Sequence, residues 1–152
     1  MLCNGDATGA ITVAGANGTT VYTYSLDGGT TTQISGSFNN LNAGAITVTV
    51  VDANGCTFDS NVTITDPNEI IITTSAIDAN CGQADGVISV TSSIGGSGVY
   101  VSETWTDALG NTITNTTAVV SGSYTVTVTD DLGCTGSGVA NVSDLSGPFA
   151  AV

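Results

Sequence analysis

Residues 44–56 (GAITVTVVDANGC) and residues 122–134 (GSYTVTVTDDLGC) match without a gap and carry the strongest structural signal in the chain. In each stretch apolar side chains take every second position, as Ile46, Val48 and Val50 do, and threonines stand between them. This alternation is typical of a β-strand that buries one face, because successive side chains of a strand point to opposite sides. The Asp-x-x-Gly that follows predicts a tight turn with a positive φ at its glycine. The pattern therefore predicts an all-β fold.

The two stretches belong to a repeat of 78 residues. Cys3 recurs as Cys81 and Cys56 recurs as Cys134, in both cases 78 positions later. A period of this length, with a set of strands in each copy, is typical of whole domains joined end to end. We expect one domain over residues 1–66, a second over residues 67–145, and the start of a further repeat or a tail over residues 146–152.

The first copy of the repeat lacks an opening strand. An apolar run at residues 70–77 precedes Cys81, whereas only Met1 and Leu2 precede Cys3. We expect the chain to be a slice of a longer array. The alternative is that the tail of a neighbouring subunit supplies the absent strand, as in strand-addition complexes.

Short alternating segments separated by Gly-rich turns fill both copies, and no helical period is present. Six or seven short strands per copy predict two tandem immunoglobulin-like antiparallel β-sandwich domains. The side chains expected in the two cores are Ile11, Val13, Tyr24, Leu41, Ile46, Val48, Val50 and Ile64, then Ile88, Val90, Trp105, Val119, Tyr124, Val126, Val128 and Val142.

The cysteines are expected to staple the domains. Because each copy folds alike and holds its own pair, we predict one disulfide in each domain, Cys3–Cys56 and Cys81–Cys134. Closing a loop of this length stabilises by about 4 kcal/mol in the chain-entropy model, and such bridges persist outside the reducing cytosol. The alternative is four free thiols. A zinc site is disfavoured, since the chain has no His and no closely spaced cysteine pair.

The charge excludes several classes of partner. The chain has no Lys, Arg or His and 13 acidic residues, for a formal net charge of -13. Binding to nucleic acid or to an anionic membrane needs Lys and Arg, so neither partner is expected. Without His or Lys the ordinary general bases and Schiff-base amines are missing, so we do not expect an enzyme. No cofactor is expected either, and calcium is the candidate metal.

Calcium binds carboxylate and carbonyl oxygens. Asp52 and Asp130 recur at the turn, and Asp66 and Asp144 recur at the exit of the last strand. The candidate calcium ligands are Asp52, Asp66, Glu69, Asp78, Asp130 and Asp144. The favoured alternative is that these aspartates cap turns through hydrogen bonds to the backbone. Tyr22, Tyr100 and Trp105 are candidate stacking platforms for a surface polysaccharide, against the alternative that they are core residues.

The residues also resemble a known module. The signature Gly44-x-Ile46-Thr-Val-Thr-Val-x-Asp52-x-x-Gly55-Cys56, the alternating strand that ends at Asp66-Pro67, and the upstream residues 22–25 (YTYS) are similar to the SprB repeat of giant Bacteroidetes adhesins. The resemblance implies type IX secretion, display at the cell surface, and a role in cell adhesion or gliding motility.

We therefore expect a structural shaft or spacer repeat of a large secreted surface adhesin, with neighbouring repeats as its partners. One alternative is a subunit of an extracellular filament that self-associates by strand complementation. The other is a calcium- or glycan-binding module.

Overall fold

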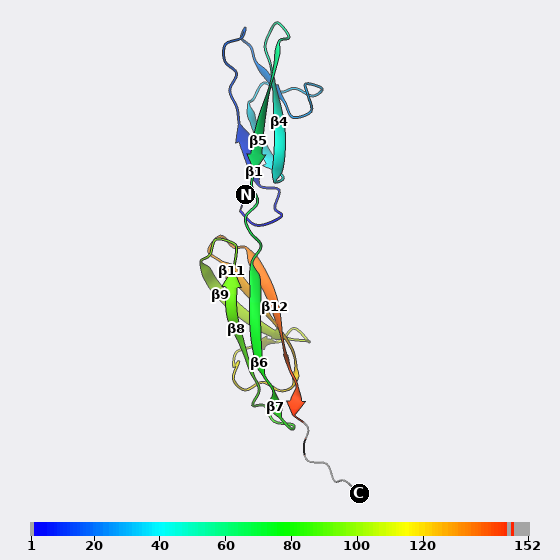
Figure 1. Ribbon diagram of the computed structural model, residues 1–152, viewed down its shortest axis with the longest axis vertical. Coiled ribbons are helices and arrows are strands. Elements are labelled where there is room, and N and C mark those ends of the chain that lie inside the picture. The colour runs from blue at the N-terminus through cyan, green and yellow to red at the C-terminus, as the bar shows by residue number, and fades with distance from the viewer. Residues whose placement is uncertain (1, 146, 148–152) are drawn as a thin grey trace. The chain divides into compact units, whose positions relative to one another are not determined.

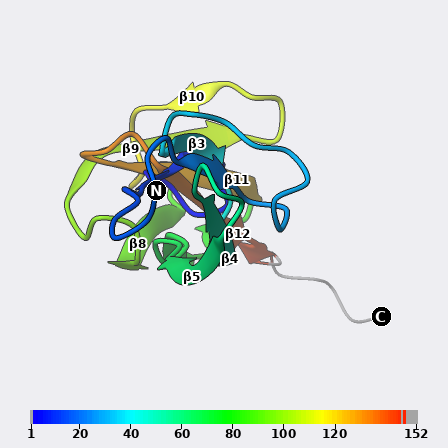
Figure 2. The same cartoon turned by 90° about the horizontal axis from the view of Figure 1, so that it is seen from above.

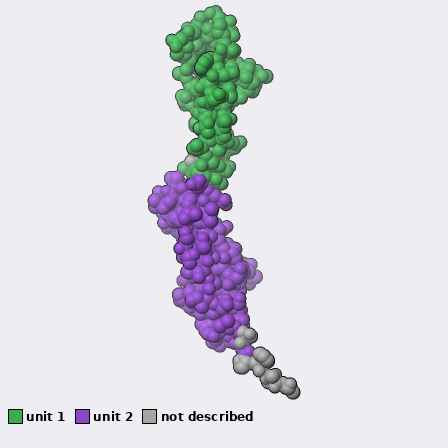
Figure 3. All heavy atoms as spheres, viewed as in Figure 1, with its two compact units in different colours: residues 1–67 green, residues 68–152 purple. Residues whose placement is uncertain are grey.

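The computed structural model describes residues 2–145 and 147, and these residues form strands, turns and loops. They divide into two compact units, residues 1–67 and residues 68–152, which are coloured separately in Figure 3. The prediction of an all-β fold is confirmed. Among the described residues no helix is long and apolar enough to cross a membrane. The tail or further repeat expected at residues 146–152 lies, except for Gly147, outside the described residues.

Unit 1 contains two small antiparallel sheets. One pairs β1 with β3, and the other has the order β2-β4-β5. The strands are β1 (Gly9–Thr12), β2 (Thr23–Ser25), β3 (Ser37–Leu41), β4 (Gly44–Val51) and β5 (Thr57–Ile64).

The β4–β5 hairpin contains residues 44–56, the stretch whose sequence pattern predicted a strand and a turn most clearly. Its ladder runs from Gly44 opposite Ile64 to Val51 opposite Thr57, and the two strands lie side by side in Figures 1 and 2. The turn that joins them has φ of 81° at Gly55, and the matching turn of unit 2 has φ of 85° at Gly133. Both positive φ angles were predicted from the sequence, and glycine adopts them without the steric cost of a Cβ.

Unit 2 repeats this hairpin inside a larger assembly. One sheet has the order β10-β9-β11-β12, β6 pairs with β8, and β13 pairs in parallel with β7. The strands are β6 (Ile71–Ile77), β7 (Ala79–Asn80), β8 (Val87–Ile94), β9 (Tyr100–Asp107), β10 (Thr112–Ile113), β11 (Gly122–Asp130), β12 (Thr135–Val142) and β13 (Asp144–Leu145).

None of the expected core residues is exposed. Ten of them are buried, namely Ile11, Tyr24 and Val48 in unit 1 and Ile88, Trp105, Val119, Tyr124, Val126, Val128 and Val142 in unit 2. The others, Val13, Leu41, Ile46, Val50, Ile64 and Val90, are half-buried. Most of the half-buried members belong to unit 1, which therefore has the more open core.

Strand β6 closes the core of unit 2. It pairs with β8 from Ile71 opposite Ile94 to Ile77 opposite Val87. It also lies against β12, where the Thr74 hydroxyl donates a hydrogen bond of 2.6 Å to the Val139 carbonyl oxygen. The close approach is possible because β12 carries glycines at the contact: a Cβ on Gly136 would lie 2.5 Å from the Ile70 carbonyl oxygen.

Gly136→Ala is therefore expected to push β6 away from β12 and to destabilise unit 2 by about 1–3 kcal/mol, as overpacking of a filled interior does. Urea unfolding followed by Trp105 fluorescence measures the change. Gly122→Ala is the matched control, since a Cβ on Gly122 meets nothing closer than 3.7 Å. Equal stability of the two variants would contradict the packing of β6 on β12.

Candidate functional site

The aspartate of the predicted turn motif binds backbone amides in both units. In unit 1, Asp52 Oδ1 accepts hydrogen bonds of 2.9 Å from the N–H groups of Asn54 and Cys56. Asp52 Oδ2 accepts a third, of 3.0 Å, from the N–H of Thr19. The carboxylate thus fixes its own turn and attaches a distant loop to it. We call residues 52–56 and their equivalents anchored turns.

The anchored turn of unit 2, residues 130–134, has the same three bonds. Asp130 Oδ1 accepts from the N–H groups of Leu132 at 3.0 Å and Cys134 at 2.8 Å. Asp130 Oδ2 accepts from the N–H of Ser97 at 2.9 Å. Asp130 is only 1% exposed, so burial of this charge depends on those amides. The alternative of turn-capping aspartates is the arrangement that the structure shows.

A third anchored turn was missed at the sequence level. Asp107 Oδ1 accepts from the N–H groups of Leu109 at 2.9 Å and Asn111 at 2.8 Å, and the N–H of Gly110 donates to the Asp107 carbonyl oxygen. The signal was present in the sequence, because residues 107–110 also read Asp-x-x-Gly. It was overlooked because this turn does not recur in unit 1.

These bonds lower carboxyl pKa values. The N–H of Thr19 and then that of Cys56 hold the pKa of Asp52 below its usual value. The N–H of Ser97 is the largest cause of the lowered pKa of Asp130, against the opposing effect of burial. In Asp27 the Ser25 hydroxyl and the Thr31 amide lower the pKa to about 2. Each case follows from hydrogen bonding to the charged form, which favours ionisation.

The four remaining predicted calcium ligands lie outside the anchored turns. Asp66 binds the N–H of Gly5 at 3.0 Å, and its equivalent Asp144 binds the N–H of Gly82 at 3.2 Å. Asp78 accepts a bond of 2.8 Å from the N–H of Ser143. The backbone carbonyl oxygen of Glu69 packs against Gly95.

The structure does not gather the predicted ligands. Over residues 2–145 and 147 no three His, Cys, Asp or Glu side chains lie close enough together to hold a metal ion. Asp52 and Asp130 direct their oxygens at backbone N–H groups instead. Calcium binding stays a prediction from the sequence.

The disulfide prediction needs correction. Cys56 and Cys81 are free and exposed, whereas Cys3 and Cys134 are disulfide-bonded. Neither Cys3–Cys56 nor Cys81–Cys134 is formed. The expectation of a staple within each domain is therefore wrong, and so is the alternative of four free thiols.

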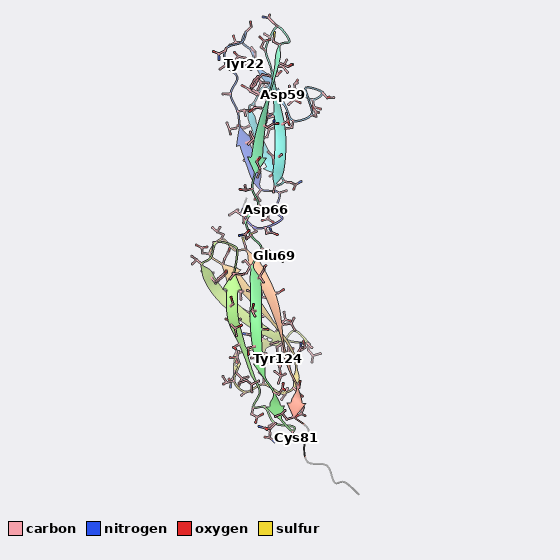
Figure 4. All side chains as sticks on the ribbon, viewed as in Figure 1. Tyr22, Asp59, Asp66, Glu69, Cys81 and Tyr124 are labelled. Atoms are coloured by element: carbon pink, nitrogen blue, oxygen red, sulfur yellow. The ribbon has the colours of Figure 1, made fainter. Side chains whose placement is uncertain are left out.

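The reason is the length of the strand that follows the anchored turn in each unit, β5 or β12. Cys56 directly precedes β5, while the loop that carries Cys3 is attached to Asp66, just after β5. A strand of eight residues spans roughly 26 Å, and a disulfide needs Cα atoms within roughly 7 Å of each other. Cys134 and Cys81 are likewise separated by β12, and Figure 4 shows Cys81 at the β7–β13 end of unit 2.

The three candidate aromatic platforms are tied into their own units. Trp105 is 3% exposed, and its Nε1 donates a 2.6 Å bond to Glu103 Oε1. The hydroxyl of half-buried Tyr22 donates to the Gly18 carbonyl oxygen, and that of Tyr100 donates to the Gly95 carbonyl oxygen. The alternative that they serve the core is borne out for Trp105. Tyr22 lies at the end of unit 1 opposite Asp66 (Figure 4).

Comparison with known proteins identifies no family for this chain. No family model matches the chain, and no curated protein sequence matches it. The chemistry within reach is that of carboxylates bound to backbone amides and of one exposed thiol in each unit.

A thiol titration tests the cysteine states. Two thiols per native chain are expected to react with a disulfide reagent, because Cys56 and Cys81 are free and exposed. Alkylation followed by chymotryptic peptide mapping should place the label on these two residues; trypsin has no Lys or Arg at which to cut. A native chain in which Cys56 and Cys81 do not react would contradict their free state.

Asp130→Asn is expected to lower the Tm of unit 2 by several degrees, because an amide cannot accept all three N–H bonds. Asp131→Asn is the control, because Asp131 is the exposed neighbour of Asp130 and its substitution removes the same charge. Differential scanning calorimetry measures both. Equal Tm changes would mean that charge alone, and not the anchored turn, sets the stability.

Acid should also destabilise the chain. A carboxylate whose folded pKa is lowered stabilises the fold above its unfolded pKa, near 3.9, and this contribution is lost as the pH falls through the folded pKa. The Tm is therefore expected to fall from about pH 4 to about pH 2, where Asp27 protonates. Relief of like-charge repulsion acts in the opposite direction. A Tm that rises over this range would show that the repulsion dominates.

Proposed function

We propose that this chain is a structural segment of an extracellular shaft, built from immunoglobulin-like β-sandwich repeats whose work is to provide reach and resistance to proteolysis. The observation that carries the proposal is the recurrence of one anchored turn, bond for bond, at Asp52 and Asp130. A device repeated with the 78-residue period serves every domain equally, as a structural element must. A single binding site would not require it.

The chemistry of the chain supports an extracellular setting. Cys3 and Cys134 are disulfide-bonded, and such bonds persist in oxidising compartments. Since the chain has no Lys or Arg, it offers no site to trypsin-like proteases. The anchored turns stabilise the carboxylates with backbone donors, so the fold does not depend on basic side chains.

The sequence resemblance to the SprB repeat supports the same role. It rests on the strand and the Asp-x-x-Gly-Cys turn at residues 44–56 and 122–134. On this basis the shaft belongs to a large bacterial surface adhesin of the Bacteroidetes type, exported by type IX secretion and active in adhesion or gliding. The partners are neighbouring repeats.

A second candidate function is favoured by one feature of unit 1. Its strands β1 and β5 border a groove of about 420 Å³ that is lined by residues 9–13 and 62–65. A groove between two strand edges suits the addition of a strand from another molecule. This feature supports a filament subunit that assembles by strand complementation, which is a shaft made of many copies.

Shortening the shaft in its source organism tests the proposal. Deleting one pair of repeats from the gene, at the boundaries of the 78-residue period, is expected to shorten the surface structure seen by immuno-electron microscopy and to leave binding to the adhesive target intact. The matched control is a strain in which the same two repeats are replaced by their own sequence with Asp131→Asn.

The opposite outcome is equally clear. A strain that keeps the length of its surface structure but loses adhesion would assign the chain a ligand-binding role and refute the shaft. Labelling that is absent from intact cells and appears only after lysis would exclude the extracellular location.

A further inference from the structure

The two free thiols of the chain are the repeat equivalents of its two bonded cysteines. In the 78-residue period Cys81 is the equivalent of Cys3, and likewise Cys56 is the equivalent of Cys134. Cys3 and Cys134 are disulfide-bonded. Cys56 and Cys81 are free. Each of the two cysteine positions of the repeat is therefore bonded in one unit and free in the other.

The cysteine of the anchored turn has the same backbone setting in both units. The N–H of Cys56 donates to Asp52 at 2.9 Å, and the N–H of Cys134 donates to Asp130 at 2.8 Å. The carbonyl oxygen of each cysteine accepts a bond from the N–H of the same aspartate, at 3.0 Å in unit 1 and 2.9 Å in unit 2. We call these two residues turn cysteines. Since the bonds match, the backbone holds the free turn cysteine as it holds the bonded one.

The other cysteine of each unit lies in a loop at the opposite end. Asp66 and Asp144 hold these loops through the N–H groups of glycines that follow the cysteines. We call Cys3 and Cys81 loop cysteines. Figure 4 shows Cys81 at the β7–β13 end of unit 2. A unit therefore presents a turn cysteine at one end and a loop cysteine at the other.

The bonded cysteines and the free thiols each comprise one residue of either kind. Cys3 is a loop cysteine, Cys134 is a turn cysteine, and both are bonded. Of the free thiols, Cys56 is a turn cysteine and Cys81 is a loop cysteine. An unpaired cysteine in an extracellular protein indicates either a bond to a cysteine elsewhere or a reactive thiol. The bonded state of both equivalents favours the bond.

Both free sulfurs have room for a partner. Cys134 is only 6% exposed and Cys3 is half-buried, whereas Cys56 and Cys81 are exposed. Cys56 also lines a recess of about 170 Å³ at the anchored-turn end of unit 1. A Cβ placed on Gly147 would lie 3.2 Å from Cys81 Sγ, so the chain passes beside this sulfur after β13. A disulfide needs Cβ atoms within roughly 4.5 Å of each other, and a sulfur exposed at the end of a unit is accessible to another repeat.

We propose that Cys56 and Cys81 form cross-links between repeats, in which Cys56 bonds to a loop cysteine and Cys81 bonds to a turn cysteine of other repeats. The proposal rests on the shaft function and names a covalent joint of the shaft. The partner repeat belongs to the same polypeptide or to a second copy of the chain, and the chemistry of the bond is the same in both cases. Because the two ends of a unit differ, the contact is heterologous and repeats along the shaft.

Each cross-link forms by thiol–disulfide exchange with a disulfide oxidant. The thiolate of one cysteine attacks the oxidant, forms a mixed disulfide and releases the first oxidant thiol. The thiolate of the complementary cysteine then attacks the cysteine sulfur of the mixed disulfide and releases the second oxidant thiol. One S–S bond forms as one breaks, and two protons and two electrons pass from the cysteines to the oxidant. Disulfides persist in the oxidising compartments where such oxidants act.

Disulfide mapping of the surface protein isolated from its source organism tests the proposal. Free thiols are alkylated during lysis, and the unreduced protein is cleaved with chymotrypsin, because these residues include no Lys or Arg for trypsin. Peptides with Cys56 are expected to be joined to a loop-cysteine peptide, and peptides with Cys81 to a turn-cysteine peptide, without alkylation at either residue. Electrophoresis without and with reductant separates the two sources, since reduction lowers the mass only if the bond joins two copies.

Single variants of the isolated chain test the pairing rule. Cys56→Ser and Cys81→Ser each keep one free thiol, and neither is expected to form dimers with glutathione disulfide as oxidant, because no complementary thiol is present. An equimolar mixture should form dimers joined through Cys81 of one variant and Cys56 of the other. In the matched control, Cys81→Ser also carries Cys56→Ser and Ala53→Cys, which moves the exposed thiol within the anchored turn. The mixture with this control should lose the dimer, while near-ultraviolet circular dichroism stays native.

Three results would overturn the proposal. The first is alkylated Cys56 or Cys81 in the surface protein, and the second is a bond between two loop cysteines or between two turn cysteines. The third is dimers from either single variant at the rate of the mixture, because exposure alone would then govern the bond. Mapped cross-links without dimers from the mixture assign the partner to the same polypeptide. None of these results affects the shaft function, which the repeat-deletion strain tests separately.

Discussion

The bond between a carboxylate and a backbone N–H is the interaction on which this structure depends. Because the chain has no Lys, Arg or His, none of its acidic side chains can form an ion pair with another side chain. Backbone amides are the donors that remain. Asp52, Asp107 and Asp130 each accept two N–H bonds of their own turn on a single oxygen. The negative charges thereby determine where the strands reverse, and the largest share of each lowered pKa comes from hydrogen bonds.

The anchored turns also determine where the cysteines stand. Cys56 and Cys134 donate their N–H groups to the anchoring aspartates, so each sulfur is held at the turn end of its unit. Asp66 and Asp144 hold the loops of Cys3 and Cys81 at the other end. A repeat that places its two cysteines at opposite ends cannot staple itself, whatever their spacing in sequence.

The sequence was sufficient for the features that depend on local patterns. Alternation located β4, β5, β11 and β12, the glycines of two turns indicated positive φ, and the apolar positions gave the core. It was not sufficient where two distant segments must be placed together. The recurrence of Cys3 and Cys56 suggested a pair, yet it contains no information about which end of the hairpin each occupies. Trp105 could not be separated from a surface platform, because its burial depends on strands that approach from elsewhere.

The two units share one arrangement of strands but differ at two positions of the strand that follows the anchored turn. Gly136 and Gly138 allow unit 2 to accept its own opening strand with two isoleucines against β12. The equivalent positions of unit 1 are Phe58 and Ser60. A chain of net charge -13 cannot attract its copies through side-chain charge, and it repels them at low ionic strength. Non-covalent contacts between copies of such a chain must therefore come from backbone hydrogen bonds and apolar burial, and salt that screens the repulsion favours them.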